Sequence, residues 1–155
     1  MGTAYKGGNA TNIAGNIPKL AEEGQQGGVK KIIYDSFALT ADLASGDTIV
    51  MGGLVPAGAM IVGCELISDA LGGSCTVNVG WQASADGVES ASAAGLFSAA
   101  AVSTASVLGL GSTGGAPGAF GKVFPSPVQL VIAENAVSSG ATGKYIRLAL
   151  SYIET

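Results

Sequence analysis

The sequence contains no histidine, and only 12% of its residues are charged, against about 25% in an average soluble domain. Without an imidazole there is no ordinary triad base and no common set of transition-metal ligands. No Ser-x-x-Lys motif occurs, and the acidic residues from Asp35 to Glu134 are scattered rather than paired. We therefore expect no enzymatic activity, no cofactor and no metal ion, with a weak calcium site of loop carboxylates as the open alternative.

Positive charge is also scarce, since the net charge is −4 and Lys30-Lys31 is the only basic cluster. Nucleic-acid binding relies on clustered Lys and Arg, so we expect no nucleic-acid partner. The chain has no run of about 18 apolar residues, so we expect no membrane partner. Its first residues lack the apolar middle region of a signal peptide, which predicts folding in a cytoplasm.

Cysteine occurs twice, as Cys64 and Cys75. In a cytoplasmic protein both are expected to be small buried apolar residues. Their spacing also fits positions on adjacent strands, so a disulfide stays open as an alternative.

Small neutral residues are abundant: 48% of the chain is apolar, and 25 residues are glycine. A surface with so little charge is usually covered by a partner or by copies of the same chain. The alternative is that Gly, Ala and Ser merely inflate the apolar count.

Residues 1–30 differ from the rest, because they are rich in Gly and Asn and follow neither a helical nor a strand period. They predict a flexible, extended N-terminal arm that is either disordered alone or ordered by lying on a neighbour, followed by a domain over residues 31–155. A frayed terminus is the alternative, and residues 18–23 fit one helical turn. The candidate contact residues of the arm are Tyr5, Lys6, Ile13, Ile17, Leu20, Lys30 and Lys31.

From residue 32 onward apolar residues alternate with polar ones, which is the period of β-strands. Val77, Val79 and Trp81 are expected to face inward from one such strand. The predicted strands cover residues 32–39, 47–51, 60–67, 76–81, 128–133 and 144–153. Six strands separated by Gly and Pro turns predict an all-β fold, an antiparallel β-sandwich or jelly roll.

Residues 84–121 are dominated by Ala, Gly and Ser. We expect strand and loop here, with a short helix over residues 92–104 as the alternative. Residues 109–114 match Gly-x-Gly-x-x-Gly, but no strand–helix context surrounds them, so we expect no phosphate site. The candidate interface aromatics are Trp81, Phe97 and Phe120; Trp81 also fits a core or rim anchor, or a sugar-stacking platform.

Several stretches carry a resemblance to a known type of protein. They are residues 34–39 and 41–47, the turn at 55–59, the strand at 77–81 with its tail at 83–86, residues 119–122 and the strand at 146–150. In these stretches the chain resembles small virion proteins of tailed bacteriophages, especially those of cyanobacterial and marine hosts, and it is similar to capsid decoration, or cement, proteins. The arm is not part of this resemblance.

The resemblance implies a β-sandwich that forms a homotrimer, binds the major capsid protein on the outer capsid surface and stabilises the head after assembly in the host cytoplasm. Two other hypotheses stay open. One is a phage tail or head-fibre protein with a glycan-binding loop in residues 84–121. The other is a carbohydrate-binding module that uses Trp81.

Overall fold

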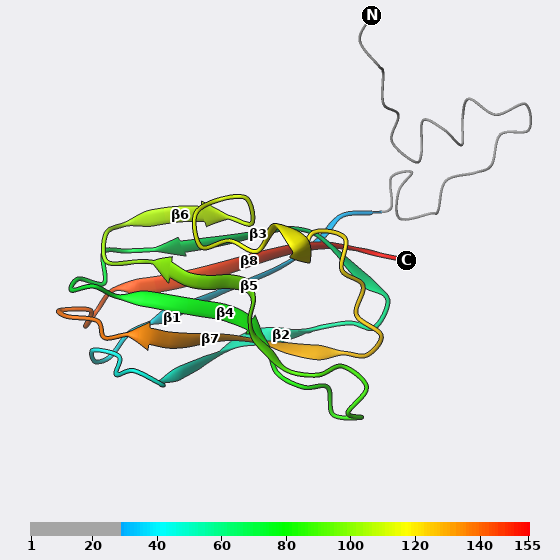
Figure 1. The fold of residues 1–155 in the computed structure, drawn as a ribbon, viewed down its shortest axis with the longest axis horizontal. Coiled ribbons are helices and arrows are strands. Elements are labelled where there is room, and N and C mark those ends of the chain that lie inside the picture. Colours follow the sequence, from blue (N-terminus) through cyan, green and yellow to red (C-terminus); the bar gives the residue numbers. More distant parts are fainter. Residues whose placement is uncertain (1–28) are drawn as a thin grey trace, which may run out of the picture.

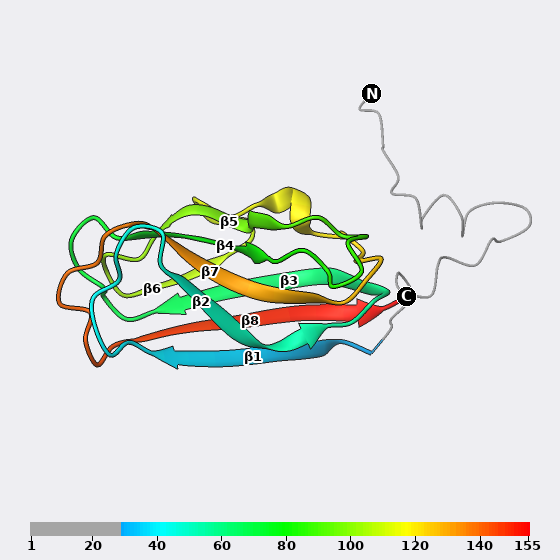
Figure 2. The same cartoon turned by 90° about the horizontal axis from the view of Figure 1, so that it is seen from below.

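The computed structural model describes residues 29–155, which form eight strands and one turn of 3-10 helix (Figure 1). The elements are β1 (Lys31–Ala38), β2 (Thr48–Val55), β3 (Ala59–Ser68), β4 (Thr76–Trp81), β5 (Ser92–Ala101), β6 (Ser106–Gly109), η2 (Pro117–Ala119), β7 (Val128–Ala136) and β8 (Tyr145–Glu154). Sheet A has the strand order β1-β8-β3-β6, and sheet B has the order β2-β7-β4-β5. Figure 2 shows the two sheets as stacked layers.

The pairing of the strands identifies the topology. The first strand pairs with the last, β2 with β7, β3 with β6 and β4 with β5, all antiparallel. This is the pattern of one long hairpin rolled up on itself, and the additional pairs β3–β8 and β4–β7 join its halves within each sheet. Eight antiparallel strands in two such sheets make a jelly roll. The predicted all-β sandwich is therefore confirmed.

The alternation read from the sequence produces the core. Val77, Val79 and Trp81 of β4 are buried, as are Ile146 and Leu148 of β8. These side chains come from the inner faces of both sheets and pack between them, which removes their apolar area from water and stabilises the sandwich.

The Ala-rich part of residues 84–121, for which a helix over residues 92–104 was the alternative, forms the strand β5. β5 pairs with β4 on one side. On its other side, the amide of Ser98 donates to the carbonyl of Gly114 at 2.7 Å, and the amide of Ala116 donates to the carbonyl of Leu96 at 2.8 Å. The glycine-rich stretch after β6 thus covers the edge of β5 through residues 114–116.

Cys64 and Cys75 are buried free thiols, so the structure does not contain the alternative disulfide. Burial raises the pKa of each thiol to about 12, and beside Cys75 the carboxyl of Glu134 adds to the shift. The Cys75 thiol donates to Oε1 of Glu134 over 3.0 Å. Burial also raises the pKa of Glu134. Both cysteines therefore behave as inert core residues.

A close contact between β4 and β5 depends on a glycine. A Cβ atom at Gly95 would lie 2.2 Å from Cζ3 and 2.3 Å from Cη2 of Trp81. Because the indole ring is buried in the sandwich, it has no room to move away. The bare backbone at Gly95 therefore sets the position of the tryptophan.

We predict that Gly95→Ala lowers the free energy of unfolding by about 1–3 kcal/mol, because it overpacks this contact. Gly118→Ala in η2 is the matched control, since a Cβ there meets nothing within 4 Å. Denaturant unfolding followed by circular dichroism measures both variants. Equal stability of Gly95→Ala and the wild type would contradict the proposed contact.

Candidate interaction surface

The candidate contact residues of the arm fall in two groups. Tyr5, Lys6, Ile13, Ile17 and Leu20 lie outside the described residues. Lys30 and Lys31 lie at the start of the domain and are described below.

Lys31 opens β1 and forms an ion pair with Glu154 near the end of β8, with Nζ and Oε1 2.6 Å apart. The hydrogen bond to Glu154 raises the pKa of Lys31. Both side chains are about half exposed, so the pair contributes little stability on its own. It joins the first and last strands at the end of the domain where the arm begins.

Two of the three candidate interface aromatics belong to the core, which corrects the sequence-based prediction. Phe97 is 0% exposed and Trp81 is 5% exposed. Phe97 lies opposite Val79 in the β4–β5 pair, so its ring fills the space between the sheets. Trp81 is a core anchor, which is one of the interpretations that its sequence position allows. Its buried ring offers no open face for a sugar.

Trp81 also organises one end of the sandwich. Its ring meets that of Phe124 edge to face, with centroids 5.1 Å apart, and its Nε1 donates to the carbonyl of Ser90 at 3.0 Å. The Nζ of Lys122 lies 5.2 Å from both ring centroids and 2.9 Å from Oε1 of Glu89. The partly buried ion pair of Lys122 and Glu89 thus lies next to the rings of Trp81 and Phe124, and the ammonium group interacts with both.

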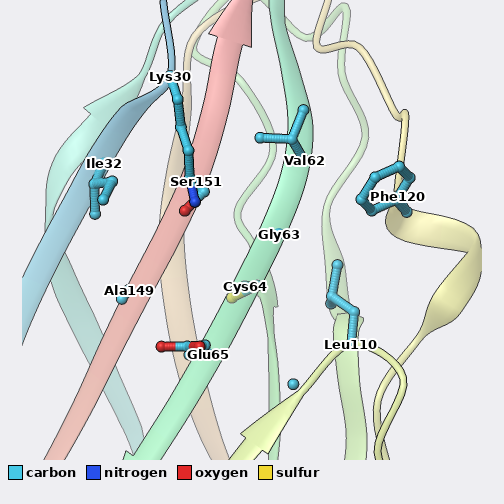
Figure 3. A pocket seen from close by; sticks show the side chains of 11 residues that line it. Lys30, Ile32, Val62, Gly63, Cys64, Glu65, Leu110, Phe120, Ala149 and Ser151 are labelled. Carbon is cyan, nitrogen blue, oxygen red and sulfur yellow. The ribbon is translucent and has the colours of Figure 1, made fainter.

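Phe120 is different, because it is 64% exposed and follows η2 directly. It lies at the rim of a hollow on the outer face of sheet A, which we call the sheet A hollow (Figure 3). Lys30 and Ile32 border the hollow on one side, and Leu110 and Phe120 border it on the other. Its volume is about 310 Å³.

The register of the strands explains why the surface is hollow at this place. Ser151 of β8 lies between Ile32 of β1 and Gly63 of β3. Two residues earlier in β8, Ala149 lies between Tyr34 of β1 and Glu65 of β3. The floor is therefore made of small side chains while larger apolar ones stand around it. The hollow cannot be recognised from the sequence, because it depends on which strands are neighbours.

The hollow carries one residue of each charge, Lys30 at its border and Glu65 on β3. Glu65 is exposed and takes part in none of the ion pairs formed within residues 29–155. Its carboxylate is thus available to a cation from outside the described domain.

A second hollow, of about 460 Å³, lies at the end of sheet B, between Leu54, Gln82 and Pro127. Asp86 contributes to its wall from a tight turn, the place that its residue type favours. The carboxylate of Asp86 accepts hydrogen bonds from Ser84 Oγ at 2.5 Å, Ser126 Oγ at 2.6 Å and the amide of Val88 at 3.1 Å. These bonds, that from Ser126 first, lower the pKa of Asp86 to about 2.

Within residues 29–155, no three Cys, Asp or Glu side chains gather as the ligands of an ion would. The same part of the chain contains no helix long and apolar enough to cross a membrane. What the two hollows offer is shape and apolar contact, which suits the binding of a protein segment.

The comparison with solved structures gives a clear likeness. The chain superposes on a chain of the structure titled "Capsid of Ralstonia phage GP4" with a TM-score of 0.67 and 24% sequence identity, over 83% of this chain and 86% of the other. The two chains share a fold. No protein-family model and no curated protein sequence matches this chain. The solved chain comes from a phage capsid, the kind of particle to which the sequence resemblance points.

We predict that Asp86→Asn lowers the denaturant midpoint at pH 7, because the amide loses the charge-assisted bonds from two serines. A carboxyl whose folded pKa lies below its unfolded value stabilises the fold above the unfolded pKa. The difference between wild type and variant should therefore shrink as the pH falls from about 4 through about 2.

Unfolding curves at pH 7, 4 and 2.5 measure this difference. Ala85→Ser is the control: Ala85 is exposed in the same turn and has no ionisable side chain, so the difference between its midpoint and that of the wild type should not change with pH. A gap between Asp86→Asn and wild type that is constant with pH would show that the Asp86 carboxylate is not the titrating group.

Proposed function

We propose that this chain is a structural virion protein of a tailed bacteriophage: a capsid decoration, or cement, protein that binds the outer surface of the head and stabilises it. The observation that carries the proposal is the shared fold with a chain of a phage capsid, which extends over most of both chains. The sequence resemblance to cement proteins supports the same conclusion from different features, namely the short motifs in strands and turns.

The surface of the domain suits that role. A cement protein needs a stiff body and neutral faces that can pack against other subunits. The jelly roll supplies the body, since side chains from both sheets pack into one core between them. Large apolar side chains remain exposed on the β1 side of sheet A and beside η2, among them Ile32, Tyr34 and Phe120. We propose that such faces contact the major capsid protein and other copies in a homotrimer.

The N-terminal arm, residues 1–30, is long enough to reach a second subunit of a shell. Thirty residues span up to about 100 Å when extended, enough to cross a seam between shell subunits. Its candidate contact residues include Tyr5, Ile13, Ile17 and Leu20. Each contact needs only modest affinity, because a multimer that binds a repeating shell through several arms gains avidity.

Deletion of residues 1–30 should reduce the occupancy of the protein on capsids that lack it by about tenfold or more, since several linked contacts are lost together. Occupancy is measured by co-sedimentation with purified heads, with circular dichroism as a check that the deleted protein keeps its strands. The matched control is full-length Thr142→Ser, whose change lies in the exposed connection between β7 and β8, outside the arm and the proposed contact faces. Unchanged occupancy after the deletion would contradict an anchoring arm.

Electron microscopy of decorated particles separates the decoration role from the tail and head-fibre alternative. Density on the outer face of the head supports the proposal, and density confined to the tail contradicts it.

We predict that the purified protein has a mass in solution of three times its 15.1 kDa chain mass, because the exposed apolar faces of a low-charge domain favour self-association. Light scattering coupled to size exclusion measures the mass. A value equal to one chain at micromolar concentration would contradict the homotrimer but would leave binding to the capsid to be judged by co-sedimentation.

A further inference from the structure

The sheet A hollow is lined by apolar side chains at its rim and is open to solvent, and it lies where the β3–β8 pairing shifts register between Ile61 and Gly63. Ile32 and Phe120 stand on opposite sides of it with most of their side-chain surface exposed. Between them the floor of Gly63, Ala149 and Ser151 leaves space for side chains from another segment. Filling such a space removes apolar surface of both partners from water.

The course of the chain points to an occupant. Lys30 borders the hollow, so the chain enters the domain at the wall of the hollow. Twenty-eight residues precede the described part, and residues 13–21 among them contain the apolar side chains Ile13, Ile17 and Leu20. A segment attached at the wall of a binding site is present there at millimolar effective concentration.

The connection between this segment and the hollow has a suitable length and composition. Residues 22–28 read Glu-Glu-Gly-Gln-Gln-Gly-Gly. A connector of this length spans at most about 25 Å, and its three glycines allow the chain to reverse direction without steric cost. A return of residues 13–21 over the outer face of sheet A is therefore within reach.

The charges agree with the same occupant. Lys19 lies between Ile17 and Leu20 in the sequence, so an apolar segment that enters the hollow brings one cation with it. Glu65 offers a carboxylate in the hollow that no described residue pairs. An ion pair there fixes the register of the segment more than it adds affinity.

We infer that residues 13–21 of the same chain dock in the sheet A hollow, with apolar side chains of the segment over Ala149 and Ser151 and with Lys19 near Glu65. This inference concerns the free protein and does not depend on the proposed capsid function. A second copy and an unrelated partner are the competing occupants, and the experiment below separates them.

The test is disulfide formation in the full-length double variant Ile17→Cys with Ala149→Cys. Ala149 is on the floor of the hollow. The native thiols do not compete, because Cys64 and Cys75 are buried with pKa values raised to about 12. The single variant Ile17→Cys checks this directly. The matched control pair is Ile17→Cys with Val50→Cys, since Val50 is exposed on β2 in sheet B.

Oxidation is followed on non-reducing gels at low micromolar protein. We expect the pair in the hollow to form an intramolecular disulfide at least about tenfold faster than the control pair. Adding Leu20→Asp should slow that reaction by about tenfold or more, because one apolar side chain of the docked segment is lost.

Equal rates for the two pairs would overturn the inference. Rapid formation of disulfide-linked dimers in place of the intramolecular product would also overturn it, and would assign the hollow to a second copy. Addition of purified capsids is not part of the test, so a failure here leaves the decoration role to its own experiments.

Discussion

The ten-residue alternation of β8 is the constraint on which the rest of the structure depends. β8 lies inside sheet A, between β1 and β3. Its inward residues, among them Ile146 and Leu150, build the core, while outward Ala149 and Ser151 form the floor of the sheet A hollow. A register slip of one residue would place the small side chains in the core and the large ones on the surface. The alternation of β8 thus determines both the core and the interaction surface.

The two sheets leave open sides that a jelly roll has to protect, and this chain protects them differently. On the β5 side, the stretch after β6 hydrogen-bonds along the outer edge of the strand. On the other side, the carboxylate of Asp35 in β1 accepts a hydrogen bond from the amide of Gly52 in β2, which joins the two sheets. These contacts bridge the outer edge of β5 and the gap between β1 and β2, and they leave the outer faces of the sheets free for contacts with other chains.

The fold could be predicted from the sequence wherever side chains alternate strongly. β3, β4, β7 and β8 fall within a few residues of their predicted positions. β5 was harder to recognise, because its Ala and Ser residues fit a helix as well as a strand, and its pairing with β4 decides the matter. The prediction that Phe97 lies at an interface was wrong for the same reason: only the β4–β5 pair reveals that its ring points into the core.

The sheet A hollow could not have been found from the sequence at all. It requires Ile32, Ser151 and Gly63 in one row across three strands, and these residues are distant in the chain. Phe120 could be singled out as an aromatic residue among small ones. The residues beside it in the sequence, however, do not indicate which residues face it across the hollow. A surface made by residues that are neighbours across strands can be recognised only when the strand order and the register are known.

The two roles inferred for the arm compete for the same residues. Side chains such as Ile17 and Leu20 that lie in the hollow are not available to a shell, so attachment through them has to displace them. A tether at millimolar effective concentration leaves a segment of millimolar intrinsic affinity about half docked. Release then costs less than about 1 kcal/mol, which the several arms of a multimer on a repeating surface can supply together. Docking in the hollow would thus cover the apolar side chains of the free protein and still permit attachment.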